Sequence, residues 1–291
     1  MIYPIPLFKA DDKCAEYKQL LHYTNLDSLT YIINGKTLKC NSLKNVNDQL
    51  KQKRKGLEDI TGAYYVSCFC HDQHEIVPFW FMYGGDAPDN QKVLLRFKNF
   101  SCDFANVVNT DLAYTADRKK LYSDEKHLFA VHKNGLLCCP INDPDVENRQ
   151  TIRNIRLFNV DYLLPDHEVF SKAYREMGEV SFGKGQDFLP ARISDARHIG
   201  KHKTIHWKYE EETRIQCALD PIGSYYHDYI LLALKDKIFQ DLVIVANPWA
   251  TDEFLTNIAD VVARAPLPEE VKSSISIERS ELNGQIIERR T

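Results

Sequence analysis

Hydrophobic and polar positions in the first forty residues follow first the period of a strand and then that of a helix. Residues 20–24, LLHYT, form a short apolar run typical of a strand. Asn25 is placed to cap a helix that Gly35 would end. The apolar positions of that helix recur at helical spacing: Leu26, Leu29, Ile32 and Ile33. Residues 37–40 predict a second strand.

The next sixty residues predict three further elements. The aromatic and β-branched run YYVSCFC, residues 64–70, is typical of a buried strand. Residues 75–83 form an apolar segment that Gly84 and Gly85 end, and residues 92–97 predict another strand. The resulting order of strand, helix, strand, strand, helix, strand favours an α+β or α/β fold over a bundle or a sandwich.

The middle of the chain carries weaker patterns. Residues 100–160 are rich in turn-forming residues, so we expect a variable or inserted segment there, with short strands at 128–131 and 157–162. Helical patterns follow at 165–177 and 189–198. No internal repeat and no long linker divides residues 1–291, which predicts a single domain.

The last third predicts a more regular alternation of elements. Residues 229–234 and 241–246 are strand-like, and a helix is expected from Asp252 to Arg264, before Pro266 and Pro268. Residues 274–279 predict a final strand.

Composition and charge exclude several classes of protein. The chain is 44% hydrophobic and 27% charged, with a net charge of -4, which argues against a generally basic nucleic-acid-binding protein. The apolar runs are too short to span a bilayer, and the N-terminus has no basic segment followed by an apolar one. We therefore expect a cytoplasmic protein with no membrane partner.

Cysteine and histidine spacing does not predict a metal site. The eight cysteines show no repeated C-x-x-C spacing, which favours reduced, buried thiols. Cys68, Cys70, His71 and His74 lie close together in sequence but match no standard zinc pattern, so no metal is expected.

The stretch 201–215, KHKTIHWKYEEETRI, is the strongest candidate for chemistry. If it is a strand, Glu210, Glu212 and Arg214 project to one face and Glu211 projects to the other. If it is a helix, Trp207, Glu210 and Arg214 share a face, and the row is an ordinary solvated Glu–Arg pair. The sequence leaves both interpretations open.

Several short motifs, in order, resemble the bacterial domain-of-unknown-function 2971 family. The resemblance covers nearly the whole chain apart from the first fifteen or so residues and the middle. Gln49 stands where that family usually has a proline. The motifs are His22-Tyr23-Thr24 before a helix, the Asn47-Asp48 loop, YYVSCFC followed by Trp80 and Tyr83, Trp207-x-x-Glu210-x-Glu212-x-Arg214, the turn at Ile244–Pro248, and SISIERSELNG.

The same residues resemble ADP-ribosyltransferases more distantly. Those enzymes carry a histidine and a threonine on an early strand, a serine on a middle strand and a glutamate on a late strand. This chain departs from them at Ser67, which lies in VSCF and not in a Ser-Thr-Ser run, and its middle segment has no counterpart. The resemblance implies an α+β fold with a split two-sheet core. It also implies NAD as substrate, a protein or nucleic-acid acceptor, and a role as a toxin or antiviral effector.

The resemblance assigns the catalytic chemistry to two carboxylates. Glu212 would stabilise the oxocarbenium-like ribose formed when nicotinamide leaves, and would hold its 2′-hydroxyl. Glu210 would accept a proton from the acceptor, because neighbouring carboxylates tend to divide their pKa values and roles. Arg214 would orient both groups or meet a phosphate.

Six further residues are implied to bind NAD: His22, Tyr23, Thr24, Ser67, Trp80 and Tyr83. His22, supported by Thr24, would hydrogen-bond a ribose hydroxyl, and Ser67 would meet the carboxamide or a ribose. Trp80 or Tyr83 would stack on nicotinamide. This hypothesis requires His22, Ser67 and Glu212 to converge from three strands.

Two alternatives remain open. The same residues fit a non-enzymatic module that binds a nucleotide or peptide, with the histidine, serine and aromatic residues as ordinary core residues. A weaker alternative is a nuclease-like or DNA-binding protein that uses the basic run KQKRKG, residues 51–56, although such runs are often only solubilising.

Overall fold

The computed structural model describes residues 7–10, 14, 16–46, 62, 64–71, 74–84, 88, 91–98, 100, 130–132, 135–137, 152–165, 199–219 and 228–286. Its helices, including three short 3₁₀ helices labelled η, are α1 (Leu26–Gly35), η2 (Leu43–Asn45), α3 (Val77–Met82), η7 (Ile205–Glu210), η8 (Asp236–Phe239), α7 (Asp252–Arg264) and α8 (Glu269–Ser274). Its strands are β1 (Leu7–Ala10), β2 (Gln19–Asn25), β3 (Thr37–Ser42), β4 (Tyr64–Cys70), β5 (Lys92–Lys98), β6 (Ala130–His132), β7 (Gly135–Leu137), β8 (Ile152–Asn159), β9 (Asp161–Leu163), β10 (His202–Thr204), β11 (Glu212–Leu219), β12 (Tyr229–Ala233), β13 (Val243–Ala246) and β14 (Ser276–Arg279).

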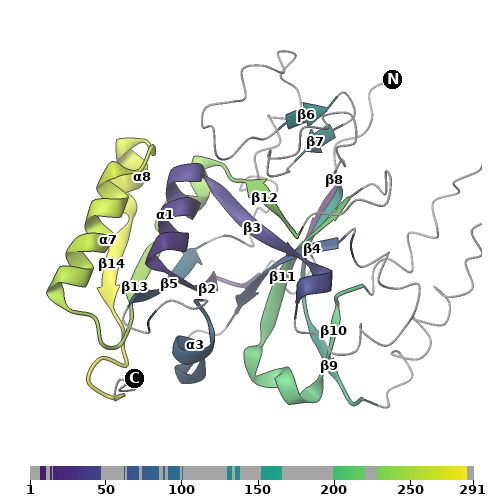
Figure 1. Ribbon diagram of the computed structural model, residues 1–291, viewed down its shortest axis with the longest axis horizontal. Helices are drawn as coiled ribbons and strands as arrows, with labels where there is room; N and C mark the ends of the chain where they lie inside the picture. The colour runs from purple at the N-terminus through teal and green to yellow at the C-terminus, as the bar shows by residue number, and fades with distance from the viewer. Residues whose placement is uncertain are drawn as a thin grey trace, which may run out of the picture.

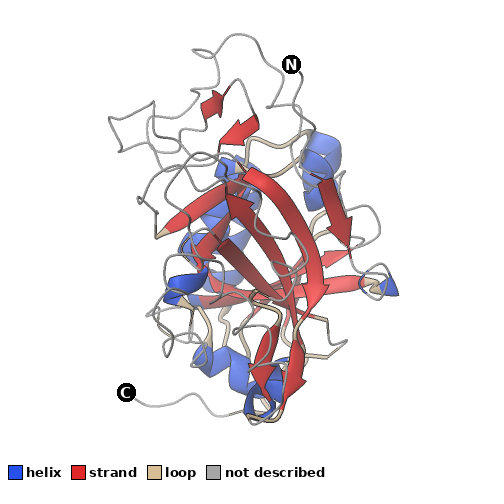
Figure 2. Cartoon of the chain, turned by 90° about the vertical axis from the view of Figure 1, so that its right-hand side faces the viewer, coloured by secondary structure: helices blue, strands red, loops and turns tan. Residues whose placement is uncertain are grey.

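Ten of the described strands form one mixed sheet (Figure 1). The main path runs β1-β8-β11-β4-β2-β5-β13-β14, and β3 joins β4 and carries β12. Figure 2 shows that this sheet is twisted and curved, with the helices around it. This arrangement is in keeping with an α+β class. One continuous sheet stands where two separate sheets were expected.

The sheet is nearly divided where β2 meets β4. These strands pair at one position, Leu21 with Cys70. Further along, β4 pairs with β3 through Val66 and Tyr65, while β11 pairs along the whole length of its other edge. Strands β2 and β3 therefore share one edge of β4 and diverge from it, which makes a fork beside residues 67–69 of β4.

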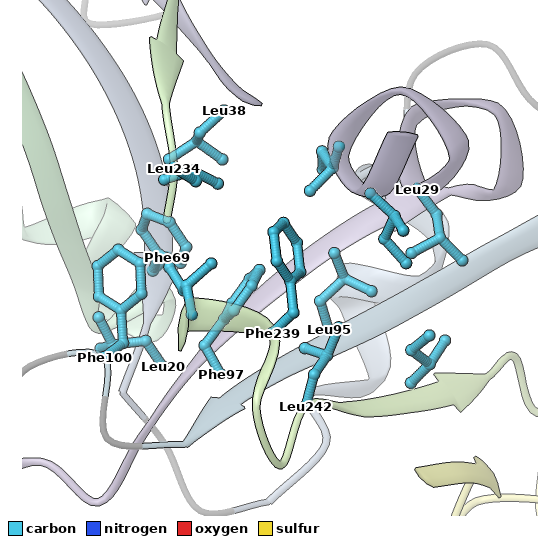
Figure 3. Packing of buried hydrophobic residues seen from close by; sticks show 14 of the residues in the cluster. Leu20, Leu29, Leu38, Phe69, Leu95, Phe97, Phe100, Leu234, Phe239 and Leu242 are labelled. Carbon is cyan, nitrogen blue, oxygen red and sulfur yellow. The ribbon is translucent and has the colours of Figure 1, made fainter. Parts of the chain in front are cut away.

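Strand alternation gives the sheet two distinct faces. The core face carries Leu20, Phe69, Leu95 and Ile215 within the largest apolar cluster, shown in part in Figure 3. Helices α1 and α7 contribute to this cluster and pack against each other. The opposite face, here called the glutamate face, carries Leu21, Cys70 and Glu212.

The strongest local patterns predicted their elements closely. Asn25 caps α1, because its side-chain oxygen accepts a hydrogen bond from the Ser28 amide at 2.8 Å. The chain leaves that helix through Lys36, which has a left-handed conformation with φ 49°. Helix α7 has the predicted bounds and is capped by Thr251.

The weaker patterns were displaced. Ser274, the first residue of the strand predicted at 274–279, is the last residue of α8, and β14 begins at Ser276. The short helix before this strand was therefore not predicted. The strand expected at 157–162 is divided between β8 and β9. Strand β8 lies within the segment expected to be variable, yet it pairs with β11 in the main sheet.

Other predictions fall on residues outside those described. They concern the loop at Asn47-Asp48, the run KQKRKG, almost all of the helix at 165–177 and the helix at 189–198. Among the described residues, no helix is both long and apolar enough to cross a membrane.

A buried glutamate fastens α3 to the segment that follows β14. The Glu75 carboxylate accepts hydrogen bonds from Trp80 Nε1 at 3.0 Å and from the Glu281 amide at 2.9 Å. It also accepts a hydrogen bond from the Ser280 hydroxyl and lies 3.4 Å from Arg96 Nη2. The Glu75 amide in turn donates to the Glu281 side chain at 2.8 Å. Through these bonds Ser280 and Glu281 of the SISIERSELNG motif are joined to Glu75, which gives this motif a structural role.

We expect Glu75→Ala to lower the free energy of unfolding by about 3–5 kcal/mol, because it leaves the guanidinium of Arg96 and several buried donors without an acceptor. Urea unfolding measures this change. Glu278→Ala, an exposed position on β14, is the matched control and should stay within about 0.5 kcal/mol of the wild type. Equal effects of the two substitutions would contradict a tie through Glu75.

Candidate functional site

The stretch 201–215 is neither one strand nor one helix. Glu210 is the last residue of η7, and Glu212 is the first residue of β11. Glu211 between them has a left-handed conformation with φ 40°, which is uncommon outside glycine and turns the chain sharply. The expectation that both glutamates lie on one strand was therefore wrong, although Glu212 and Arg214 do share a strand face.

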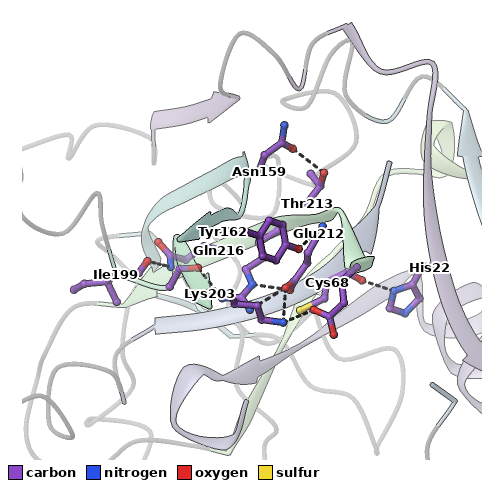
Figure 4. Close-up of polar contacts among 12 residues, drawn as sticks. His22, Cys68, Asn159, Tyr162, Ile199, Lys203, Glu212, Thr213 and Gln216 are labelled. Carbon is purple, nitrogen blue, oxygen red and sulfur yellow. Dashed lines mark hydrogen bonds and ion pairs between the residues drawn. The ribbon is translucent and has the colours of Figure 1, made fainter. Parts of the chain in front are cut away.

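Both glutamates nevertheless converge on one lysine. Lys203, on β10, places its Nζ 2.6 Å from Glu210 Oε2 and 2.7 Å from Glu212 Oε2. All three side chains are buried. Figure 4 shows Lys203 and Glu212 pointing toward each other, while Thr213 points away toward Asn159. The predicted pairing of two carboxylates is thus present, and a third residue brings it about.

Arg214 completes the charge balance of this cluster. Its Nε and Nη2 donate to the two oxygens of Glu212 at 2.6 and 3.0 Å, a bidentate pair between residues two apart on one strand. Its Nη1 donates to the Gly200 carbonyl at 2.6 Å. Gly200 has φ 70°, and a Cβ there would lie 3.0 Å from Gln216 Nε2. Both the backbone conformation and the short distance to Gln216 therefore favour glycine at this position.

Three further side chains surround the carboxylates. The Tyr83 hydroxyl donates a short hydrogen bond to Glu210 Oε1. The Tyr162 hydroxyl accepts a hydrogen bond from the Glu212 amide at 2.8 Å. The Cys68 thiol, opposite Arg214 in the β4–β11 register, hydrogen-bonds the Glu212 carboxylate. We call Lys203, Glu210, Glu212 and Arg214 the ion cluster.

The electrostatics of the ion cluster keep Glu212 and Lys203 charged. Burial raises the pKa of Glu212, but the attraction of Arg214 and Lys203 outweighs it and lowers this pKa to about 2. Burial acts to lower the pKa of Lys203, and the two carboxylates raise it overall. Burial, together with Glu210, raises the pKa of the Tyr83 hydroxyl. Glu212 is therefore a carboxylate and Tyr83 a neutral donor at neutral pH.

Three of the residues predicted to accompany Glu212 from β2 and β4 lie on the core face: His22, Thr24 and Ser67. Ser67 is directly opposite Ile215 in the β4–β11 register, so its side chain shares the face of Ile215 and not that of Glu212. The His22 ring packs at 5.2 Å against Phe69, also on the core face. Thr24 is buried on the same face of β2. The expected convergence of the His22, Ser67 and Glu212 side chains is not observed.

His22 sits in the fork between β2 and β4. Its Nδ1 lies 2.9 Å from the Cys68 carbonyl, which can only accept, so Nδ1 carries the proton. Burial lowers the pKa of His22, and this hydrogen bond raises it only in part. The ring is therefore neutral at neutral pH and links the two strands where their backbones diverge.

The predicted aromatic residues lie on the glutamate face, with different exposure. Trp80 is fully buried, packs edge-on against Tyr23, and donates its indole hydrogen to Glu75. Tyr23 is also buried, and its hydroxyl accepts a hydrogen bond from the Ile76 amide at 2.8 Å. Tyr83 alone of the three contacts the ion cluster. Trp80 thus presents no exposed surface on which nicotinamide can stack.

Within the described residues no group of three or more histidine, cysteine, aspartate or glutamate side chains is arranged to hold a metal ion. Cys68 and Cys70 face the glutamate side of β4, where Cys68 bonds Glu212. His71 instead stacks on Tyr17 at 4.4 Å and meets the Thr213 hydroxyl on the other side of the sheet.

No role was predicted for Lys203 or Tyr162. A signal for Lys203 was present: two glutamates and one arginine leave one negative charge, and a buried charge requires a partner. Lys203 lies seven positions before Glu210. Tyr162 gave no such signal, since it ended a predicted strand whose boundaries were themselves displaced.

Comparison of the chain with protein-family models, curated proteins and solved structures gave no match. The resemblances to the 2971 family and to ADP-ribosyltransferases therefore depend on the sequence motifs and remain predictions.

The lowered pKa of Glu212 predicts a pH-dependent contribution to stability. Because this pKa is lower in the folded chain, ionised Glu212 stabilises the fold at neutral pH, by roughly 3 kcal/mol, and the contribution is lost as pH falls from 4.5 toward about 2. Urea unfolding of Glu212→Gln should show a large loss at pH 7 and a clearly smaller one near pH 3. Glu211→Gln, the exposed neighbour, should change stability little at either pH. A pH-independent effect of Glu212→Gln would contradict the assignment.

Proposed function

We propose that the protein is an NAD-dependent mono-ADP-ribosyltransferase that modifies a macromolecule, protein or nucleic acid, with Glu212 and Glu210 as its reactive carboxylates. The observation that supports this proposal is the convergence of the two glutamates on Lys203 from different elements. Two carboxylates that share one ammonium can divide the roles of electrostatic stabiliser and proton acceptor. The proposed acceptor is a protein or a nucleic acid, the two classes that the resemblance implies.

In the proposed reaction the bond between the ribose C1′ and the nicotinamide nitrogen breaks, and nicotinamide leaves with the bonding electrons. Glu212 is held ionised, and a carboxylate beside the ribose stabilises the positive charge that develops there. The acceptor nucleophile then bonds C1′ and gives its proton to Glu210. The Tyr83 hydroxyl, which donates to Glu210, orients the group that receives this proton.

His22 and Ser67 enter this proposal in a different way from Glu212. Both side chains lie on the core face, so neither reaches the carboxylates, and only His22 has a hydrogen bond across the fork. A neutral His22 links β2 to β4 in the fork and does not share a face with the ribose that Glu212 would hold. Arg214 is fully occupied by Glu212 and Gly200, which makes it a positioning residue and not a phosphate ligand.

A second candidate is a non-enzymatic module that binds a nucleotide or peptide, and one observation favours it. Both oxygens of Glu212 are already taken by Arg214 and Lys203. A pair engaged in this way is also found in purely structural clusters, where loss of one member leaves an uncompensated charge. Under this alternative the ion cluster fixes η7 and β11 and performs no chemistry.

Nicotinamide release from NAD separates the two candidates. For the transferase we expect measurable release by the wild type and a fall of at least about 100-fold in Glu212→Gln, as for loss of one group that stabilises a transition state. Glu211→Gln should retain wild-type release, because that side chain is exposed and outside the cluster. Tyr83→Phe, which keeps the ring, should lower the rate and leave the fold intact.

The stability of each variant is measured beside its activity. Loss of release in Tyr83→Phe with unchanged unfolding supports catalysis at the ion cluster. No release by the wild type, together with a strong destabilisation of Glu212→Gln, supports the binding module instead. Equal release by wild type and a folded Glu212→Gln would exclude Glu212 as the catalytic carboxylate.

A further inference from the structure

The outer surface of η7 interleaves basic and aromatic side chains. His206, Lys208 and Tyr209 are exposed, and Trp207 is half-buried between them. Between Lys201 and Tyr209 the sequence contains no carboxylate. The next residue, Glu210, is buried and neutralised by Lys203. This surface, residues 206–209, is therefore cationic and aromatic, even though the whole chain is negatively charged.

Most of the exposed large apolar side chains belong to η7 or to segments linked to it. Five large hydrophobic residues are exposed within the described part of the chain, and Tyr31 on α1 is the only one of these that lies elsewhere. Helix α3 carries two of the others, Val77 and Met82, and its Phe79 packs against the Tyr209 ring. Leu164 follows β9, which packs against η7. In Figure 1, α3 and the β9–β10 pair lie along the lower edge of the molecule. The four exposed residues on η7 and on these linked segments are thus Val77, Met82, Leu164 and Tyr209.

The aromatic side chains of this surface are held in place from below. Tyr209 meets Phe79 edge to face at 6.4 Å and Trp207 at 6.2 Å. Lys203 Nζ lies 5.5 Å from the centre of the Trp207 ring, so Trp207 connects the surface to the ion cluster. Rings supported in this way lose little side-chain freedom when a planar ligand stacks on them.

We propose that the surface 206–209 binds single-stranded nucleic acid, with bases stacked on Tyr209 and Trp207 and a phosphate contacted by Lys208 and His206. Stacking on fixed aromatic rings together with nearby cations is how proteins bind single strands with little sequence preference. The net charge of -4 confines binding to a few nucleotides, because the rest of the chain repels a polyanion. A protein partner fits less well, since Lys208 stands between the two aromatic residues, and the exposed carboxylate that follows in the chain, Glu211, is directed to His71, 3.9 Å away.

This surface directly precedes Glu210 in the chain, which gives the proposal a consequence for the reaction. A strand held on Tyr209 lies next to the group proposed to receive the acceptor's proton. If the protein is the transferase proposed above, its acceptor is then nucleic acid and not protein. The binding itself is independent of that function and is tested separately.

The test measures fluorescence anisotropy of labelled oligo-dT and oligo-U, each about twelve nucleotides long, at about 50 mM salt. We expect saturable binding by the full chain. Tyr209→Ala should raise Kd at least about fivefold, the loss expected for one stacked base. Lys208→Glu should weaken binding of both oligonucleotides and reduce its dependence on salt.

Tyr31→Ala is the matched control, because Tyr31 is an exposed tyrosine on α1 away from this surface, and it should bind as the wild type does. No saturable binding, or equal Kd values for Tyr209→Ala and Tyr31→Ala, overturns the proposal. Nicotinamide release without oligonucleotide is assayed in parallel. Retained oligonucleotide binding without release contradicts only the transferase, and release with label passing to protein contradicts the nucleic-acid acceptor.

Discussion

The Lys203 ammonium, shared between Glu210 and Glu212, is the interaction on which the described geometry of this region depends. Without it two buried carboxylates would lie close together with only Arg214 to balance them. Like charges in a buried site cannot both remain ionised, so one glutamate would take up a proton or move into solvent. The left-handed Glu211, the short β10 strand and the glycine at position 200 all serve to bring the four charged groups together. Local backbone strain of this kind persists only where the surrounding contacts hold it.

The fork between β2 and β4 sets the second constraint. Because the strands pair only at Leu21 and Cys70, the backbone beyond that pair is free of ladder bonds between them, and His22 supplies a side-chain bond to Cys68 in their place. Cys68 also reaches Glu212 with its thiol. Cys68 thus joins the fork to the ion cluster, because its backbone carbonyl bonds His22 and its side chain bonds Glu212. It therefore contacts one residue on each face of the sheet, His22 and Glu212.

Much of the fold could be predicted from the sequence, whereas the site could be predicted only in part. Asn25, the apolar period of α1 and the bounds of α7 are local signals, and local signals identified those elements. Glu210 and Glu212 were found because carboxylates two apart beside an arginine are unusual. Their arrangement was missed, since the left-handed Glu211 lies between two glutamates that contact Lys203 and Arg214, and no local pattern contains those contacts. The side on which Ser67 faces follows from the register of β4 against β11, a long-range pairing that an apolar run cannot specify.

The same ion pairs that keep Glu212 ionised also limit what it can do. Glu212 already accepts two hydrogen bonds from Arg214 and one from Cys68, and it pairs with Lys203, so its roughly four acceptor positions are filled. A ribose hydroxyl can bond it only if one partner leaves, and the partners are not equivalent. Arg214 is fixed by two bonds to Glu212 and one to Gly200, and it lies fully buried. Lys203 has a flexible stem, is shared with Glu210, and lies under the Trp207 ring at the surface. A ligand that stacks near Trp207 and offers a negative group would compete for this lysine alone. Under the proposed function, displacement of Lys203 is the change that frees an oxygen of Glu212, and Trp207 links this lysine to the surface formed by residues 206–209.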